Sequence, residues 1–177
     1  MAQKTAAPPT WPQQIHRIFT REGITQVCYV PDAGHGRLID LCLADRTMKT
    51  VVLTSEQEGV ALLAGAWLGG ARGALLMQSS GVGNCINMLG LIQECRFPLL
   101  ALVTMRGDWG EFNPWQMPMG EGTRPALAAA GVIVKAVEDA ARVEDTVFAA
   151  TRLAFSTTRP VAVLLGQRVI GFKDWSK

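Results

Sequence analysis

Short apolar runs alternate with amphipathic segments along most of this chain. The runs at 26–30, 50–53, 74–78, 99–104, 132–136 and 161–165 have the length and the apolar content of buried strands. The segments between them place apolar residues three or four positions apart or are rich in small helix-forming residues, and they predict helices over 11–22, 37–45, 56–68, 84–94, 123–130 and 143–157. This alternation predicts an α/β fold with three layers, in which helices cover both faces of a doubly wound, mainly parallel six-stranded sheet.

One stretch, residues 105–122, breaks the regular pattern. It holds two tryptophans, one phenylalanine and three methionines, a composition that argues against disorder. We expect this segment to lie against another surface. The chain shows no internal repeat and no linker, so we predict a flexible N-terminus over 1–11, a single domain over 12–170 and a C-terminal tail over 171–177.

Composition points to a protein interface. Hydrophobic residues make up 49% of the chain and charged residues 18%, with a mean hydropathy of +0.18, yet no apolar run is long enough to span a bilayer. The net charge of +2 comes from basic and acidic residues spread along the chain, which gives no basic surface for nucleic acid. We therefore expect neither a membrane nor a nucleic acid as the partner.

The cysteines indicate a reduced, cytoplasmic protein. Cys28, Cys42, Cys85 and Cys95 show no C-x-x-C spacing, and with only two histidines in the chain we expect no metal site. Cys28 and Cys42 lie in apolar runs, where a free cysteine behaves as a small buried hydrophobe. The N-terminus has no hydrophobic signal core.

Two strand-to-helix junctions bring candidate chemistry to one edge of the predicted sheet. Glu56 follows the strand at 50–53, and the glycine-containing stretch 79–84 follows the strand at 74–78. Open α/β sheets bind their ligands at the carboxyl ends of the strands, so we expect both junctions at one site. Ser55 and Glu58 have the spacing of a capping box, which leaves Glu56 free for another role or merely complementing the helix dipole.

Five motifs in register resemble a known enzyme family. They are Val30-Pro31-Asp32, Glu58-Gly59, the run from Leu76 to Asn84, Arg106-Gly107, and the run from Gln116 to Gly120. Over residues 12–166 the chain resembles the pyrimidine-binding domain of thiamine diphosphate-dependent 2-oxo-acid decarboxylases, and within them the sulfopyruvate and phosphonopyruvate decarboxylases.

The resemblance implies a set of cofactor-binding residues. Glu56 matches the glutamate that hydrogen-bonds the aminopyrimidine ring and promotes proton removal from the cofactor. Gly81 and Gly83, with Asn84 beside them, match the backbone that approaches this ring, while Pro31 and Asp32 match a loop that flanks it. Simpler structural roles are a tight turn capped by Asn84 and a Pro-Asp turn.

Four further residues are candidates for contact with substrate. His35 is an expected proton shuttle facing the substrate, or else a loop histidine in solvent. Arg106 is suited to bind a sulfonate, phosphonate or carboxylate, or else is merely exposed. Gln78 and Gln116 are weaker candidates of the same kind.

The family's diphosphate-binding motif is missing. Members bind Mg²⁺ and the diphosphate through a domain marked by Gly-Asp-Gly, and the similar triplet here is Gly107-Asp108-Trp109. The resemblance therefore implies a beta subunit that carries this second domain and most of the Mg²⁺ site. The expected assembly is a hetero-oligomer with at least two copies of each subunit, acting on a short anionic 2-oxo acid.

Other functions remain open at this point. A related lyase or a carboligase of the acetolactate type would use the same cofactor, and a non-catalytic scaffold would keep only the fold. A flavin- or nucleotide-binding module would use Gly81 and Gly83 at a helix start, but the third glycine of the dinucleotide fingerprint is replaced by Ile86.

Overall fold

The computed structural model describes residues 8–172, and its strands form one parallel sheet in the order β2-β1-β3-β4-β6-β5. The strands are β1 (Ile24–Tyr29), β2 (Lys49–Val52), β3 (Arg72–Gln78), β4 (Leu99–Thr104), β5 (Ile133–Val137) and β6 (Pro160–Leu165). Every neighbouring pair is parallel, with register partners such as Leu76 on β3 and Leu102 on β4. The predicted doubly wound sheet is confirmed.

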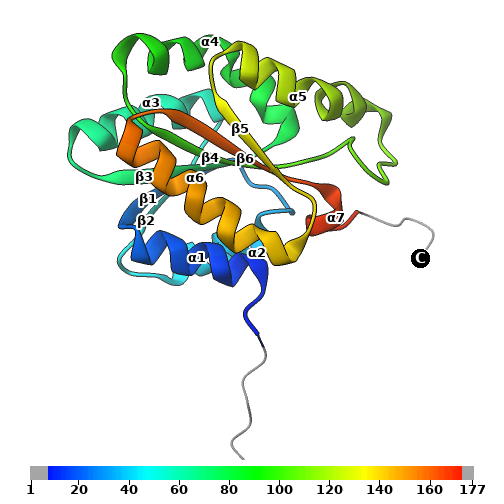
Figure 1. Cartoon of the computed structure of the whole chain (residues 1–177), viewed down its shortest axis with the longest axis horizontal. Coiled ribbons are helices and arrows are strands. Elements are labelled where there is room, and N and C mark those ends of the chain that lie inside the picture. Colours follow the sequence, from blue (N-terminus) through cyan, green and yellow to red (C-terminus); the bar gives the residue numbers. More distant parts are fainter. Residues whose placement is uncertain (1–7, 173–177) are drawn as a thin grey trace, which may run out of the picture.

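Helices cover both faces of this sheet (Figure 1). One face carries α1 (Trp11–Arg21), α2 (Gly36–Ala44) and α6 (Val143–Thr157), and the other carries α3 (Glu56–Leu68), α4 (Ser79–Cys95) and α5 (Met117–Ala129). The short elements are α7 (Gln167–Ile170) and the 3₁₀ turns Pro114–Gln116 and Ala140–Arg142.

The strand sequences explain the two cores. Successive side chains of a strand point to opposite faces, so Leu76 packs under α1, α2 and α6 while Leu75 packs under α3 and α4. Strands β4 and β6 are buried along their whole length, as expected of central strands in a sheet covered on both sides.

The chain order reverses beside β1, and this creates the crevice that α/β proteins use for ligands. From β1 the chain passes to β2 on one side of the sheet and then crosses to β3 on the other side. The loop after β1, the start of α3 and the start of α4 therefore meet at the carboxyl edge of the sheet.

Two helices begin earlier than the sequence pattern predicts. Helix α4 begins at Ser79, so the glycine-containing stretch forms its first turn and is not a loop. Helix α5 begins at Met117, which leaves only the first half of the 105–122 segment irregular. Gly120 made this segment look irregular in the sequence. A Cβ at this position would lie 2.4 Å from the Gly107 carbonyl oxygen, so the close packing requires glycine.

The predicted capping box at the start of α3 is wrong. The Ser55 side chain makes no capping hydrogen bond. The Glu58 carboxylate accepts a hydrogen bond from the Thr54 amide at 3.0 Å, one residue further back along the chain. Glu58 thus ties down the turn that leads into Glu56.

The ends of the chain fall largely outside the described part. The predicted flexible N-terminus includes residues 1–7 and the predicted tail includes residues 173–177, which lie outside the described residues, while residue 11 already belongs to α1. Among residues 8–172, no helix has the length and apolarity needed to cross a membrane.

All four cysteines are free, and Cys28, Cys42 and Cys85 are buried. Burial raises the pKa of each of these three thiols to about 12, so they remain protonated at neutral pH. They act as small apolar side chains, as the sequence predicted for Cys28 and Cys42.

Candidate functional site

Glu56 is a buried carboxylate at the first position of α3. Only 7% of the residue is exposed, and its Oε2 atom accepts a hydrogen bond from the Asn84 amide nitrogen at 2.8 Å. The start of a helix favours negative charge, because the first backbone N–H groups point toward it. The two junctions that the sequence placed at one site are in contact.

Because Gly81 has no side chain, the Glu56 carboxylate can pack directly against its backbone. A Cβ on Gly81 would lie 2.2 Å from Glu56 Oε1 and 2.3 Å from its Cδ, far inside van der Waals contact. A Cβ on Gly83 would meet nothing nearer than the Met119 sulfur at 3.8 Å. While Glu56 keeps this position, only glycine fits at 81, whereas a larger residue fits at 83.

Asn84 does not cap a turn. It lies inside α4, which begins five residues earlier, and its amide group reaches across to Glu56. The simpler structural role considered for Asn84 is therefore wrong.

Asp32 is held by side chains from two neighbouring strands. Its Oδ1 accepts from Gln78 Nε2 at 3.0 Å and its Oδ2 accepts from Thr104 Oγ1 at 2.5 Å. Ser80 in turn donates to Gln78 Oε1 at 2.9 Å. Asp32 thus belongs to a polar network at the sheet edge and is more than a turn residue, while Pro31 beside it is exposed.

His35 lies inside the protein, and this contradicts the alternative of a loop histidine in solvent, while the role as a proton shuttle stays a prediction. The imidazole has no exposed surface, and its Nε2 lies 3.0 Å from the Leu102 carbonyl oxygen. Burial lowers the pKa of His35, and Nδ1 has no hydrogen-bond partner. Helix α2 begins directly after His35, and the ring lies over β4, away from solvent.

Arg106 forms a two-pronged ion pair with Glu111. Its Nε and Nη2 donate to the two Glu111 carboxylate oxygens at 2.6 Å and 2.7 Å. These hydrogen bonds lower the pKa of Glu111 to about 2. Arg106 also lines a cavity of about 170 Å³ together with Asp32, Gly34 and Phe172, so the alternative of a merely exposed arginine is wrong.

The two glutamines differ in their surroundings. Gln78 joins the Asp32 network described above. Gln116 ends the 3₁₀ turn before α5, and its Oε1 atom is buried without a hydrogen-bond partner.

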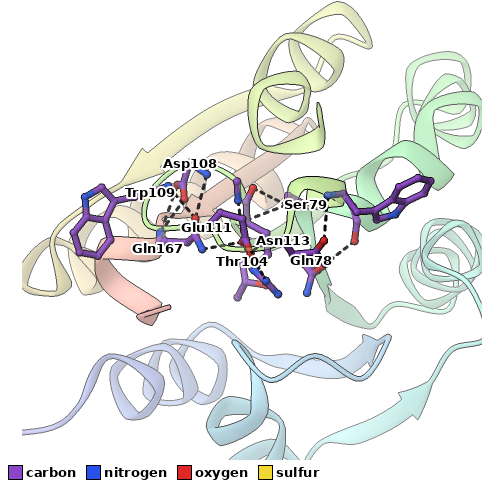
Figure 2. Close-up of polar contacts among 12 residues, drawn as sticks. Gln78, Ser79, Thr104, Asp108, Trp109, Glu111, Asn113 and Gln167 are labelled. Atoms are coloured by element: carbon purple, nitrogen blue, oxygen red, sulfur yellow. Dashed lines mark hydrogen bonds and ion pairs between the residues drawn. The ribbon is translucent and has the colours of Figure 1, made fainter. Parts of the chain in front are cut away.

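Sequence reasoning missed several members of the polar network, which Figure 2 shows. Thr104 was identified only as the end of a strand, whereas its hydroxyl binds Asp32. Glu111 and Gln167 lie in segments without periodicity, so no pattern pointed to them. Within residues 8–172 no group of three or more His, Cys, Asp or Glu side chains is arranged to hold a metal ion.

The chain is similar in sequence to several known proteins. No family profile matches the chain. It is 30% identical over 154 residues to the sulfopyruvate decarboxylase subunit alpha of Methanococcus maripaludis, covering 86% of this chain and 92% of that protein. It is 34% identical over 155 residues to the phosphonopyruvate decarboxylase of Streptomyces viridochromogenes, covering 86% of this chain and 39% of that protein.

A solved structure shares the fold. The 2-oxoglutarate:ferredoxin oxidoreductase from Magnetococcus marinus superposes with a TM-score of 0.70 at 17% sequence identity. The match covers 93% of this chain and 30% of that one, so the whole sheet with its helices recurs as one part of a larger protein.

Proposed function

Because the chain belongs to the family of sulfopyruvate decarboxylase alpha subunits, we propose that it is the alpha subunit of a heteromeric decarboxylase. Its substrate is a short anionic 2-oxo acid, sulfopyruvate or a close analogue, which is converted to the aldehyde and carbon dioxide. The observation that carries this proposal is the buried Glu56 carboxylate, held by Asn84 and lying against a glycine that has no room for a side chain.

The residues around Glu56 fit the aminopyrimidine half of thiamine diphosphate. Glu56 would supply a carboxylate for a ring nitrogen, and the first turn of α4 around Gly81 and Gly83 would supply backbone without side chains for the ring to approach. When bound, the cofactor supplies the nucleophilic carbon and the electron sink that decarboxylation of a 2-oxo acid needs.

The protein's own contribution is to orient groups and to hold protons. Asn84 donates to Glu56 Oε2, and this fixes the position of the carboxylate that would hold the cofactor ring. Asp32, supported by Gln78 and Thr104, is a second carboxylate at the same sheet edge for binding and proton transfer on the substrate side. Arg106 presents positive charge beside it for an anionic substrate.

The diphosphate and Mg²⁺ are assigned to a beta subunit. This chain lacks Gly-Asp-Gly, and the phosphonopyruvate decarboxylase that it resembles extends well beyond the matched region. Large exposed apolar side chains on α4 and on the segment after β4 support an extensive interface, among them Ile86, Trp109 and Trp115. The proposed assembly contains at least two copies of each subunit.

The decisive experiment compares Glu56→Gln with Glu58→Gln in the assembled enzyme. Both residues lie in the first turn of α3, but Glu58 is exposed and only holds the Thr54 amide. We expect Glu56→Gln to slow exchange of the cofactor C2 proton and decarboxylation by about 100-fold or more, with folding intact. Glu58→Gln keeps the wild-type exchange rate, and an unchanged rate in Glu56→Gln would refute the assignment.

Calorimetry separates this function from the other classes. Thiamine diphosphate with Mg²⁺ is expected to bind tightly to the two-subunit complex and at least about 100-fold more weakly to this chain alone, because half of the contacts are missing. A flavodoxin-like module would bind flavin without a partner, and a scaffold would bind neither cofactor in the complex.

A further inference from the structure

Gln167 is a buried polar side chain at the start of α7, directly after β6. Only 1% of the residue is exposed. Its side-chain oxygen accepts hydrogen bonds from the backbone amides of Asp108 at 3.1 Å and Trp109 at 2.9 Å. Its side-chain nitrogen donates to Glu111 Oε2 at 3.1 Å. One glutamine thus contacts three of the four residues 108–111, as Figure 2 shows.

Glu111 connects Gln167 to Arg106 in the candidate site. Its side chain is 2% exposed, and its carboxylate accepts from Arg106, from the amides of Gly107 and Asn113, and from Gln167. The orientation of the Arg106 guanidinium therefore depends on Glu111, and the position of the Glu111 carboxylate depends in part on Gln167.

Residues 107–111 form a loop whose conformation depends on such side-chain contacts. It contains two glycines with positive φ, Gly107 at +76° and Gly110 at +63°, and no regular secondary structure. Other contacts include the Trp109 ring, which packs edge-on against Phe172 and lies under the Arg168 guanidinium, and the carboxylate of Asp108, which accepts from the Gln167 backbone amide. Position 167 therefore contributes both side-chain and backbone contacts.

We propose that Gln167 is a positioning residue for Arg106. By anchoring residues 108–111 it fixes Glu111, and Glu111 fixes the guanidinium that lines the cavity beside Asp32. This inference rests on the proposed function, in which Arg106 binds the anionic end of the substrate. Loss of Gln167 therefore weakens substrate binding while the proton chemistry at Glu56 stays intact.

Two substitutions divide the roles of the glutamine. Gln167→Met keeps the size of the side chain and removes both acceptor and donor. Gln167→Glu keeps an acceptor for the Asp108 and Trp109 amides but turns the donor that faces Glu111 into a second carboxylate. Gln26→Glu is the matched control. Gln26 lies on β1 and donates to the Lys49 carbonyl oxygen on β2, and neither strand is next to β6.

Amide hydrogen exchange in the chain alone tests the anchoring. We expect Gln167→Met to accelerate exchange at the Asp108 and Trp109 amides at least about tenfold, and Gln167→Glu to accelerate it less. Gln26→Glu leaves both amides unchanged. If exchange at these two positions in Gln167→Met equals that of wild type, the anchoring role is refuted.

Steady-state kinetics of the two-subunit enzyme test the consequence for Arg106. We expect both Gln167 variants to raise KM about tenfold and to change kcat less than about threefold. For Gln167→Glu the rise in KM shrinks between pH 7 and pH 5, because a protonated carboxyl again donates to Glu111. The charged groups around this position are Asp108, Glu111, Glu138, Arg106 and Arg168.

The outcomes distinguish this inference from the proposed function. Faster exchange with an unchanged KM would show that the loop is anchored but does not position Arg106, and the inference fails. Absence of decarboxylase activity in the wild-type complex would refute the proposed function and with it the role in substrate binding, while the exchange experiment still decides the anchoring. If Gln167→Glu does not fold, Gln167→Met alone decides both points.

Discussion

Replacing Gly81 with alanine separates the geometry of the site from the stability of the fold. The new Cβ would stand 2.2 Å from Glu56 Oε1, so the carboxylate has to move by about 1 Å or more to restore van der Waals contact. The atoms in the way are the end of a side chain, which can rotate. Glu56 therefore gives way, and the helix backbone stays in place.

The energetic balance predicts a small loss of stability. Alanine favours a helix over glycine by up to about 1 kcal/mol, and less than that in the first turn of α4. Against this gain stands the hydrogen bond from Asn84 to Glu56, which is weakened at a cost of about 1–2 kcal/mol. The free energy of unfolding should therefore fall by about 1 kcal/mol. Catalysis should fall about 100-fold, because a displacement of 1 Å at a reacting group has an effect of that size.

The assay pairs urea denaturation of this chain alone with turnover of the two-subunit enzyme. Gly65→Ala is the matched control, since Gly65 lies in α3 and a Cβ there meets nothing within 4 Å. We expect the control to gain about 0.5–1 kcal/mol of stability and to keep wild-type turnover. The reasoning is refuted if Gly81→Ala turns over at the wild-type rate, or if it unfolds the chain outright.

Two further predictions concern the segment after β4. Glu111→Gln should lower the free energy of unfolding by about 2 kcal/mol at pH 7, because Arg106 loses a charged, two-pronged partner. The pKa of Glu111 is lowered from 4.5 to about 2, so its stabilisation is complete above pH 4.5 and is lost as the pH falls toward 2. The free energies of unfolding of wild type and Glu111→Gln, measured by denaturation, should converge over that interval. A difference between them that does not depend on pH would contradict the ion pair. Trp115 is 84% exposed, so Trp115→Ala should change the stability of the chain alone by less than about 0.5 kcal/mol. It should weaken binding of the beta subunit about 30-fold in calorimetry, whereas an unchanged affinity would place Trp115 outside the interface.

The sheet could be predicted from the sequence because its signal is local. Strands buried on both faces are continuous apolar runs, and β4 was predicted at its true bounds, as were α3 and α6. That the junctions after β2 and β3 share one site also followed from topology, because parallel strands bring their carboxyl ends to the same edge of a sheet, even though β1 lies between these two strands.

The features that could not be predicted from the sequence depend on contacts between residues far apart in the chain. Gly81 and Gly120 were interpreted as marks of irregular backbone, but both lie in helices whose neighbours leave no room for a Cβ. The burial of His35 depends on the path of α2 over β4, which no local pattern reveals. Gln167 has its partners more than fifty residues earlier, so neither its burial nor its hydrogen bonds could be predicted.

The first turn of α4 joins the two halves of the candidate site. Directly before it, Gln78 holds Asp32, and at its first residue the Ser79 hydroxyl accepts from the Arg106 amide at 3.1 Å. Within it, Gly81 lies against Glu56, and one turn later Asn84 holds the same carboxylate. A helix is stiffer than the loop that the glycines suggested, so it keeps Glu56 and the network around Asp32 at a fixed separation. The small residues of this stretch therefore do more than allow close approach of a ligand: they let a rigid element pack directly against a buried carboxylate.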